Sequence, residues 1–145
     1  MATGKGFGKT ILFGEHFVVY GLPAIASAIG DNTTATIEKS SGFEFVDDRP
    51  ATDGYKDKKS DEIRREIDSL LEHFNVDRKK DPVKITLSGN LFCTSGVGAS
   101  AALATSITRA MNELNGFGMN DDEINKAAYI AECAGSGGTR IGANR

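Results

Sequence analysis

The sequence predicts one domain that combines β-strands with α-helices, and three observations support this prediction. The chain has 145 residues, which is enough to bury a sizeable core in a single domain. Short runs rich in β-branched and aromatic residues occur at 9–13, 33–37 and 83–87. Apolar residues repeat at helical spacing over 63–74 and again over 103–114. Hydrophobic residues make up 39% of the chain, so intrinsic disorder is excluded.

The strands are predicted in chain order. Residues 9–13 form the first, and a glycine-bracketed loop follows it. Residues 24–29 are small and apolar, so we expect a buried strand there. Residues 33–37 and 43–46 have the pattern of half-exposed antiparallel strands, and together they predict a meander. The alternating residues at 83–87 predict one more strand.

The first two helices are predicted from their apolar stripes and their start signals. Residues 47–60 are rich in Asp, Lys, Gly and Pro, which predicts a solvated loop that leads into a helix with Ser60 near its N-cap. The stripe that follows is a core-packing face, since an amphipathic helix normally buries its apolar side within its own domain. A second helix follows the glycines of residues 96–98.

A third helix and a change of composition mark the end of the chain. Asn120 is followed by three acidic residues, a pattern typical of an N-cap and a first helical turn that complement the helix dipole. We expect this helix to run to about Cys133. Glycine, serine, threonine and arginine dominate the residues after it, which predicts a domain over 1–133 and a Gly-rich tail over 134–145.

Charge and cysteine content narrow the class of protein. The formal net charge is −3 and no strongly basic segment occurs, so a nucleic-acid partner is not expected. The sequence shows neither a signal-peptide pattern nor an apolar run long enough to span a membrane, so we expect no membrane partner and a cytoplasmic protein. Cys93 and Cys133 lack the spacing of a metal or redox pair and are expected to be two buried thiols.

Glycine is abundant, with 17 residues, and its first cluster is at 4–10. This cluster ends in Gly-Lys-Thr, as a Walker P-loop does. The P-loop pattern needs a further glycine at the position of Thr3, and it needs a preceding strand for which there is no room. The P-loop interpretation is therefore rejected.

The second cluster, at 96–102, has the features of a phosphate-binding loop. Gly96 and Gly98 allow the backbone to approach a ligand, and the small residues after them begin a helix. Free N–H groups and the positive end of the helix dipole would then face one point, where the Ser100 hydroxyl could reach a phosphate-bound Mg²⁺. A tight turn whose small residues only allow the helix to pack on a sheet explains the cluster equally well.

A third feature is the charged pair Glu15 and His16, which lies between the apolar runs 11–13 and 17–20. Polar groups in such a setting need partners. The pair forms either a structural hydrogen bond or part of a polar pocket for a small acid or polyol, and by itself it favours the structural role.

Taken together, residues 8–26 and 96–102 resemble the first two motifs of the family of galactokinase, homoserine kinase, mevalonate kinase and phosphomevalonate kinase. Gly-Glu-His followed by Phe-Val-Val-Tyr-Gly-Leu-Pro-Ala-Ile is most similar to the mevalonate kinase branch. The resemblance spans essentially the whole chain and implies an α+β N-terminal domain in which a mixed β-sheet packs with helices. The family's C-terminal domain, with its own Gly-rich motif, is absent from these residues, so we expect a truncated chain.

The resemblance also implies the site residues. Ser100 and Glu132 match the family's Mg²⁺ ligands, and Lys9 matches the lysine beside the transferring phosphoryl group. Glu15 and His16 match the substrate pocket. The residues matching the loop that wraps the ATP phosphates are Gly96, Val97, Gly98, Ala99, Ser100 and Ala101.

The implied reaction transfers the γ-phosphoryl group of ATP to the C5 hydroxyl of mevalonate, a step of isoprenoid biosynthesis. ATP and Mg²⁺ are the expected cofactors and mevalonate is the expected small-molecule partner; a homodimer is left open. When Glu132 is aligned with the family's Mg²⁺-binding Glu, Ala143 stands where the family has its catalytic Asp, the general base. We therefore expect the chain to be weak or inactive alone. The alternatives are a non-catalytic nucleotide-binding module and a sibling kinase acting on galactose or homoserine.

Overall fold

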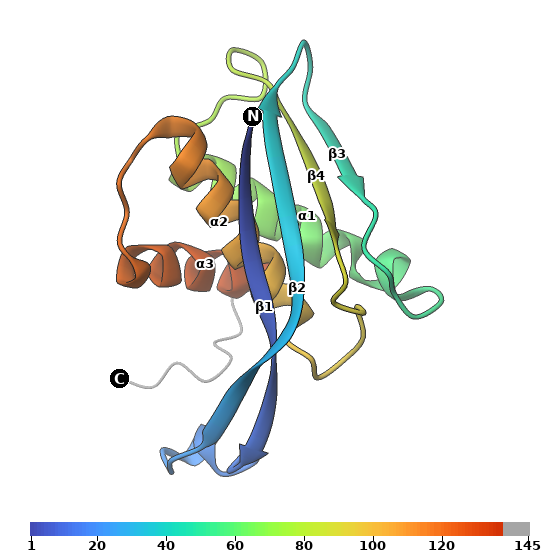
Figure 1. Cartoon of the computed structure of the whole chain (residues 1–145), viewed down its shortest axis with the longest axis vertical. Helices are drawn as coiled ribbons and strands as arrows, with labels where there is room; N and C mark the ends of the chain where they lie inside the picture. The colour runs from blue at the N-terminus through green and yellow to red at the C-terminus, as the bar shows by residue number, and fades with distance from the viewer. Residues whose placement is uncertain (138–145) are drawn as a thin grey trace.

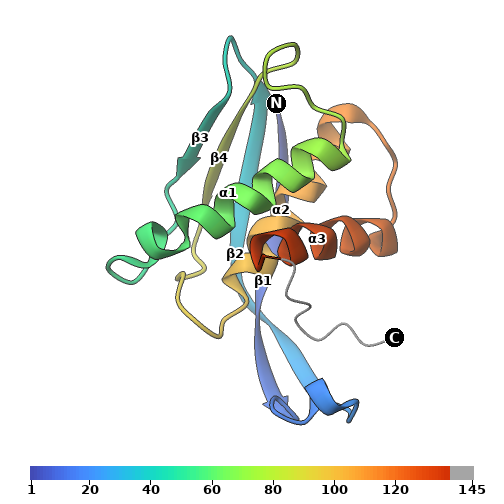
Figure 2. The same ribbon diagram turned by 180° about the vertical axis from the view of Figure 1, so that it is seen from behind.

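The computed structural model describes residues 1–137 and consists of a four-stranded mixed sheet with three helices packed on one of its faces (Figures 1 and 2). The strands are β1 (Ala2–Phe13), β2 (Ile25–Lys39), β3 (Glu44–Asp47) and β4 (Val83–Gly89). The helices are α1 (Tyr55–His73), α2 (Ala99–Asn115) and α3 (Asp121–Gly135), with a 3₁₀ turn at η1 (Val18–Tyr20). The α+β prediction is confirmed.

The strands lie in the order β1-β2-β4-β3, which differs from the predicted meander. β1 pairs with β2 and β2 pairs with β4, both antiparallel, whereas β3 pairs with β4 in parallel. The prediction of an antiparallel strand at 43–46 is therefore wrong. Parallel neighbours need a crossover connection, and α1 provides it between β3 and β4.

The glycines near the N-terminus serve packing, which agrees with the rejection of a P-loop there. Gly4 and Gly6 lie on β1, and a Cβ atom on either one would collide with the backbone of α2, at the carbonyl oxygens of Ser106 and Ala102. Because both positions lack a side chain, α2 can lie directly on the first strand. Alternate residues of β1 are buried against this helix layer.

The core lies between the sheet and the helices. It combines the inward-facing residues of β2 and β4 with the apolar stripes of the helices, among them Ala35, Ile37, Ile67, Leu70, Ile85, Leu87, Leu103, Ile107 and Met111. Cys93 is buried, as expected, but Cys133 is only half-buried, because its part of α3 borders the surface.

The boundaries of two helices differ from the predicted ones. α1 begins at Tyr55 instead of near Ser60, because Gly54 takes a positive φ and serves as the N-cap, and the lysines that suggested a loop lie in the first turns of the helix. α3 begins as predicted, with a capping box between Asn120 and Glu123, but it extends to Gly135.

The β1–β2 hairpin projects beyond the helices, with its connecting turn at the far end of the molecule (Figure 1). Residues 24–29 lie on this arm and are exposed or half-buried, so the prediction of a buried strand there is wrong. None of the helices of residues 1–137 covers them. Large apolar side chains are exposed on the arm: Leu12, Phe13, Phe17, Val18, Val19, Tyr20, Leu22 and Ile25. Among the helices of residues 1–137, none combines the length and the apolar character that a membrane crossing requires.

Candidate nucleotide-phosphate site

A cavity of about 290 Å³ lies where β1, α1 and the start of α2 meet the last turns of α3. It is lined by both polar and apolar side chains. The lining residues are Lys9, Arg49, Tyr55, Lys59, Glu62, Ile63, Glu66, Thr94, Ser95, Gly96, Gly98, Ala99, Ser100, Ala101, Leu103 and Glu132. Residues far apart in the sequence, including Lys9, Ser100 and Glu132, therefore share one cavity.

The loop before α2 has the geometry that its glycines predicted. Gly96 and Gly98 take φ values of +91° and +74°, a backbone region that is strained for residues with a side chain. Gly98 is the N-cap of α2, and within the described residues no side-chain hydrogen bond caps this helix. The N–H groups of the first helical turn, with the positive end of the helix dipole, are thus available to an anion at the cavity.

Lys9 is held beside this loop by its own backbone. Its N–H donates to the carbonyl of Val97 at 2.9 Å, which joins β1 to the loop. A Cβ atom at Gly98 would lie 2.9 Å from Cγ of Lys9, so the lysine stem packs closely on the glycine. Gly98 is therefore required for two reasons: its φ is positive, and a side chain there would collide with the Lys9 side chain.

Two carboxyl groups flank the Ser100 hydroxyl. Ser100 Oγ donates to Oε1 of Glu66 at 2.6 Å. Glu66 is 2% exposed, and its other oxygen, Oε2, has no hydrogen-bond partner within residues 1–137. Burial raises the pKa of Glu66 to about 7, with the Ser100 hydrogen bond acting in the opposite direction and Glu132 adding to the rise. Burial also raises the pKa of Glu132, while the Ser100 hydroxyl and Lys9 oppose that shift.

Glu66 is a site residue that the sequence reasoning missed, although the sequence holds a signal for it. It lies three residues after Ile63 and four before Leu70, so it is a charged residue on the apolar stripe of α1. A carboxyl group on a buried face needs a partner from elsewhere in the fold.

Arg49 is a second residue that the sequence reasoning missed, and it is 3% exposed. Its guanidinium binds Asp47 with two side-chain hydrogen bonds, Nε to Oδ1 at 2.9 Å and Nη2 to Oδ2 at 2.7 Å. Burial alone would raise the pKa of Asp47, but the hydrogen bonds and charge of Arg49 hold it below its usual value. Nη1 also donates to the carbonyl of Ala99 at 3.4 Å, which ties the start of α2 to the end of β3.

The donor set fits a phosphate-bound Mg²⁺. This ion takes oxygen ligands and is commonly held by one or two carboxylates together with phosphate oxygens. Ser100 and Glu132, which both line the cavity, offer such oxygens. In the described part of the chain, no group of three or more His, Cys, Asp and Glu side chains could hold a metal by itself, so phosphate oxygens and water would complete the shell.

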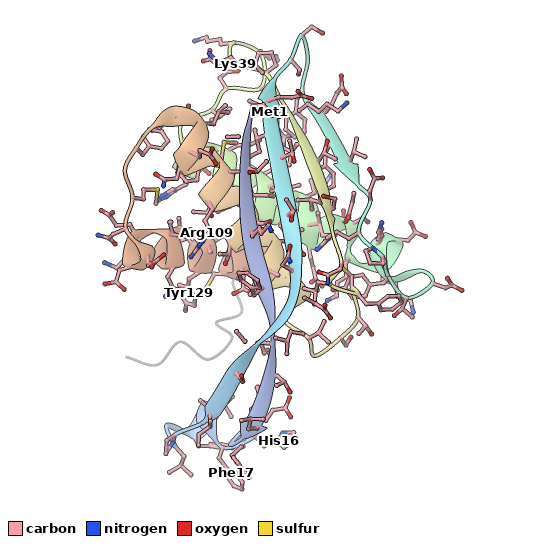
Figure 3. All side chains as sticks on the ribbon, in the orientation of Figure 1. Met1, His16, Phe17, Lys39, Arg109 and Tyr129 are labelled. Carbon is pink, nitrogen blue, oxygen red and sulfur yellow. The ribbon has the colours of Figure 1, made fainter. Side chains whose placement is uncertain are left out.

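Glu15 and His16 are not brought to this cavity. Both are exposed and lie between the strands of the projecting hairpin, and Figure 3 shows His16 at its far end, next to Phe17. Their predicted role in a substrate pocket stays a prediction. The position predicted to lack the catalytic carboxylate, Ala143, lies outside the described residues.

Comparison with known proteins supports a kinase fold. The model of the GHMP kinases N terminal domain matches residues 62–142. Mevalonate kinase from Saccharolobus solfataricus is 30% identical over 130 residues, covering 86% of this chain and 41% of that protein. Mevalonate kinase from Pyrococcus furiosus is 32% identical over 143 residues, covering 86% of this chain and 42% of that protein. The chain thus spans about two-fifths of the length of these relatives.

Solved structures give the same result. The crystal structure of L. major mevalonate kinase in complex with R-mevalonate matches with a TM-score of 0.84 and 37% sequence identity, over 97% of this chain and 43% of that chain. The crystal structure of mevalonate kinase from methicillin-resistant Staphylococcus aureus matches with a TM-score of 0.73 and 29% identity, over 94% of this chain and 46% of that chain. With the family model matching more than half of its residues, this chain belongs to the GHMP kinase family through the family's N-terminal domain.

Proposed function

We propose that this chain supplies the nucleotide-phosphate site of a mevalonate kinase, which transfers the γ-phosphoryl group of ATP to the C5 hydroxyl of mevalonate. One observation carries the proposal: the N-terminus of α2, which no side chain of residues 1–137 caps, borders the same cavity as Lys9 and Glu132. The similarity to mevalonate kinases favours this substrate over those of sibling kinases.

Each group has a role that follows from its position. The first-turn N–H groups of α2 bind the nucleotide phosphates, and the Lys9 ammonium lies beside them to offset negative charge on the transferring group. Ser100 and Glu132 would hold Mg²⁺, which when bound neutralises charge on the phosphates. The apolar wall formed by Ile63 and Leu103 limits the access of water to these charges.

Binding of ADP and Mg²⁺ to the 145-residue chain, measured by calorimetry, tests the site. We expect Ser100→Ala and Gly98→Val to weaken binding, the first by removing a Mg²⁺ ligand and the second by placing a side chain at a φ of +74° against Lys9. Ser27→Ala, on the projecting hairpin, is the matched control and should bind as the wild type does. Equal affinity for all four proteins would refute the phosphate-loop assignment.

A non-catalytic nucleotide-binding role is the second candidate, and the sequence at Ala143, where the family's general base is expected, favours it. A coupled assay of ADP release from MgATP, with mevalonate, galactose and homoserine offered in turn, separates the candidates. Turnover with mevalonate alone supports the kinase. Nucleotide binding without turnover on any of the three, with an affinity that mevalonate does not change, supports the non-catalytic role.

A further inference from the structure

Glu66 is a buried group that the proposed roles leave unused. Glu66 is one of the residues that line the cavity, and its Oε1 accepts the hydrogen of Ser100 Oγ at 2.6 Å, while Oε2 is buried without a partner among the residues described. Leaving a buried acceptor unpaired is costly, so such a group in a folded protein calls for a physical explanation.

Two neighbours hold the Glu66 side chain in place: Ser100 at the start of α2 and Gly135 at the end of α3. A Cβ atom at Gly135 would lie 2.6 Å from Cγ of Glu66, so the carboxyl stem packs directly on the last turn of α3. The preceding residue, Arg65, donates to the Gly135 carbonyl through Nη2 at 2.6 Å and through Nε at 3.1 Å. One turn of α1 therefore connects the end of α3, which carries Glu132, to the start of α2, which carries Ser100.

The direction of the hydrogen bond matters for metal binding. A hydroxyl binds a cation through an oxygen lone pair, so its hydrogen must point away from the ion. Ser100 has one hydroxyl hydrogen, and both Glu66 and Glu132 lie within its reach. When Glu66 accepts that hydrogen, the lone pairs of Oγ are left for a cation that Glu132 shares.

We propose that Glu66 is a positioning residue for the Mg²⁺ of the nucleotide: it accepts the Ser100 hydrogen and thereby aims the lone pairs of Oγ at the ion. This inference rests on the proposed function, since it assumes that Ser100 and Glu132 bind nucleotide-associated Mg²⁺. It assigns to α1 a part in metal binding that the chain's glycine-rich motifs do not show.

The test is ADP affinity of the 145-residue chain, measured by calorimetry with Mg²⁺ and again in EDTA, for the wild type, for Ser100→Ala and for three further variants. Glu66→Met keeps the size of the side chain but cannot accept a hydrogen bond, whereas Glu66→Gln keeps an amide oxygen that can. Gly135→Ala keeps the polar groups of Glu66, Ser100 and Glu132 but places a methyl group against the aliphatic part of the Glu66 side chain.

We expect Glu66→Met and Gly135→Ala to lower ADP affinity about tenfold in Mg²⁺ and to leave affinity in EDTA unchanged, while Glu66→Gln stays near the wild type. Because a misfolded variant would lose affinity in both buffers, this pattern separates positioning from a general structural effect, and thermal unfolding of each variant checks the fold.

Three outcomes overturn the inference in distinguishable ways. If Ser100→Ala weakens MgADP binding but Glu66→Met does not, Glu66 has no positioning role while the proposed function stands. If Glu66→Met and Glu66→Gln weaken MgADP binding equally, the negative charge matters and the hydrogen bond does not. If the wild-type chain fails to bind MgADP, or binds ADP equally well in EDTA, the proposed function fails and takes this inference with it.

Discussion

Replacing Glu66 with glutamine should stabilise the folded chain at alkaline pH and remove much of the pH dependence of its stability. The wild-type carboxyl is 2% exposed, and burial raises its pKa from the ordinary value of 4.5 to about 7. The unfolded chain therefore loses this proton at lower pH than the folded chain does. Between these two pKa values the native state binds more protons, so wild-type stability falls as pH rises.

The size of the effect follows from the two pKa values. A tenfold change in a proton-binding constant is worth about 1.4 kcal/mol, so the full cost of ionising Glu66 in the folded state is about 3 kcal/mol. At pH 5 a small part of this cost is already present, and at pH 8 it is nearly complete. The difference in free energy of unfolding between Glu66→Gln and the wild type should thus widen by about 2 to 3 kcal/mol from pH 5 to pH 8.

Urea unfolding at a series of pH values, in buffer with EDTA, measures this difference. With a slope of about 2 kcal/mol per molar urea, the midpoint difference should grow by about 1 M across the range. Glu72→Gln, at an exposed position of the same helix, is the matched control for the loss of one carboxylate. A Glu66→Gln difference that stays constant between pH 5 and pH 8 would refute the claim that a buried carboxyl titrates near neutrality.

Three further changes follow from the packing. Gly6→Ala should destabilise the chain by about 3 kcal/mol in urea unfolding, because the new Cβ meets the backbone of α2, whereas Gly30→Ala, in open space, should not destabilise it; equal effects would contradict this packing. Arg49→Ala should lower the free energy of unfolding by about 3 kcal/mol, because it leaves the carboxylate of Asp47, whose side chain is 9% exposed, without its partner. A decrease below about 1 kcal/mol would show that the ion pair contributes little. Phe13→Ser replaces a side chain that is 71% exposed, so it should change the free energy of unfolding by less than about 0.5 kcal/mol. It should also lower the fluorescence of an apolar dye bound to the chain. Unchanged fluorescence would show that the dye binds a surface other than the hairpin.

Features that depend on chain neighbours could be predicted from the sequence. Gly96 and Gly98 adopt the positive φ values that the pattern before α2 indicated, and Ser100 lies in the first helical turn as expected. Asn120 forms the predicted capping box, because its partner is only three residues away. Helical spacing in the same way predicted the buried stripe of α1, although Gly54 moved the start of that helix.

Features that depend on distant elements could not be predicted in this way. The pattern of residues 24–29 suits a buried strand, but whether a strand is buried depends on what covers it, and here the strand extends past the helices. Residues 43–46 carry a strand pattern that does not specify a partner, and the crossover through α1 gave them a parallel one.

The sequence by itself indicated most of the strands and helices, the positive φ values of Gly96 and Gly98 and, through the motifs of residues 8–26 and 96–102, the kinase family to which the chain belongs. Only the tertiary structure decided that the Glu66 carboxyl meets the Ser100 hydroxyl and that Lys9 and Glu132 border the same cavity. The physical reason is separation along the chain: Glu66 and Ser100 are 34 positions apart, and periodicity and capping extend over only a few residues. Such a contact forms only when packing of the helices on the sheet brings the two side chains together.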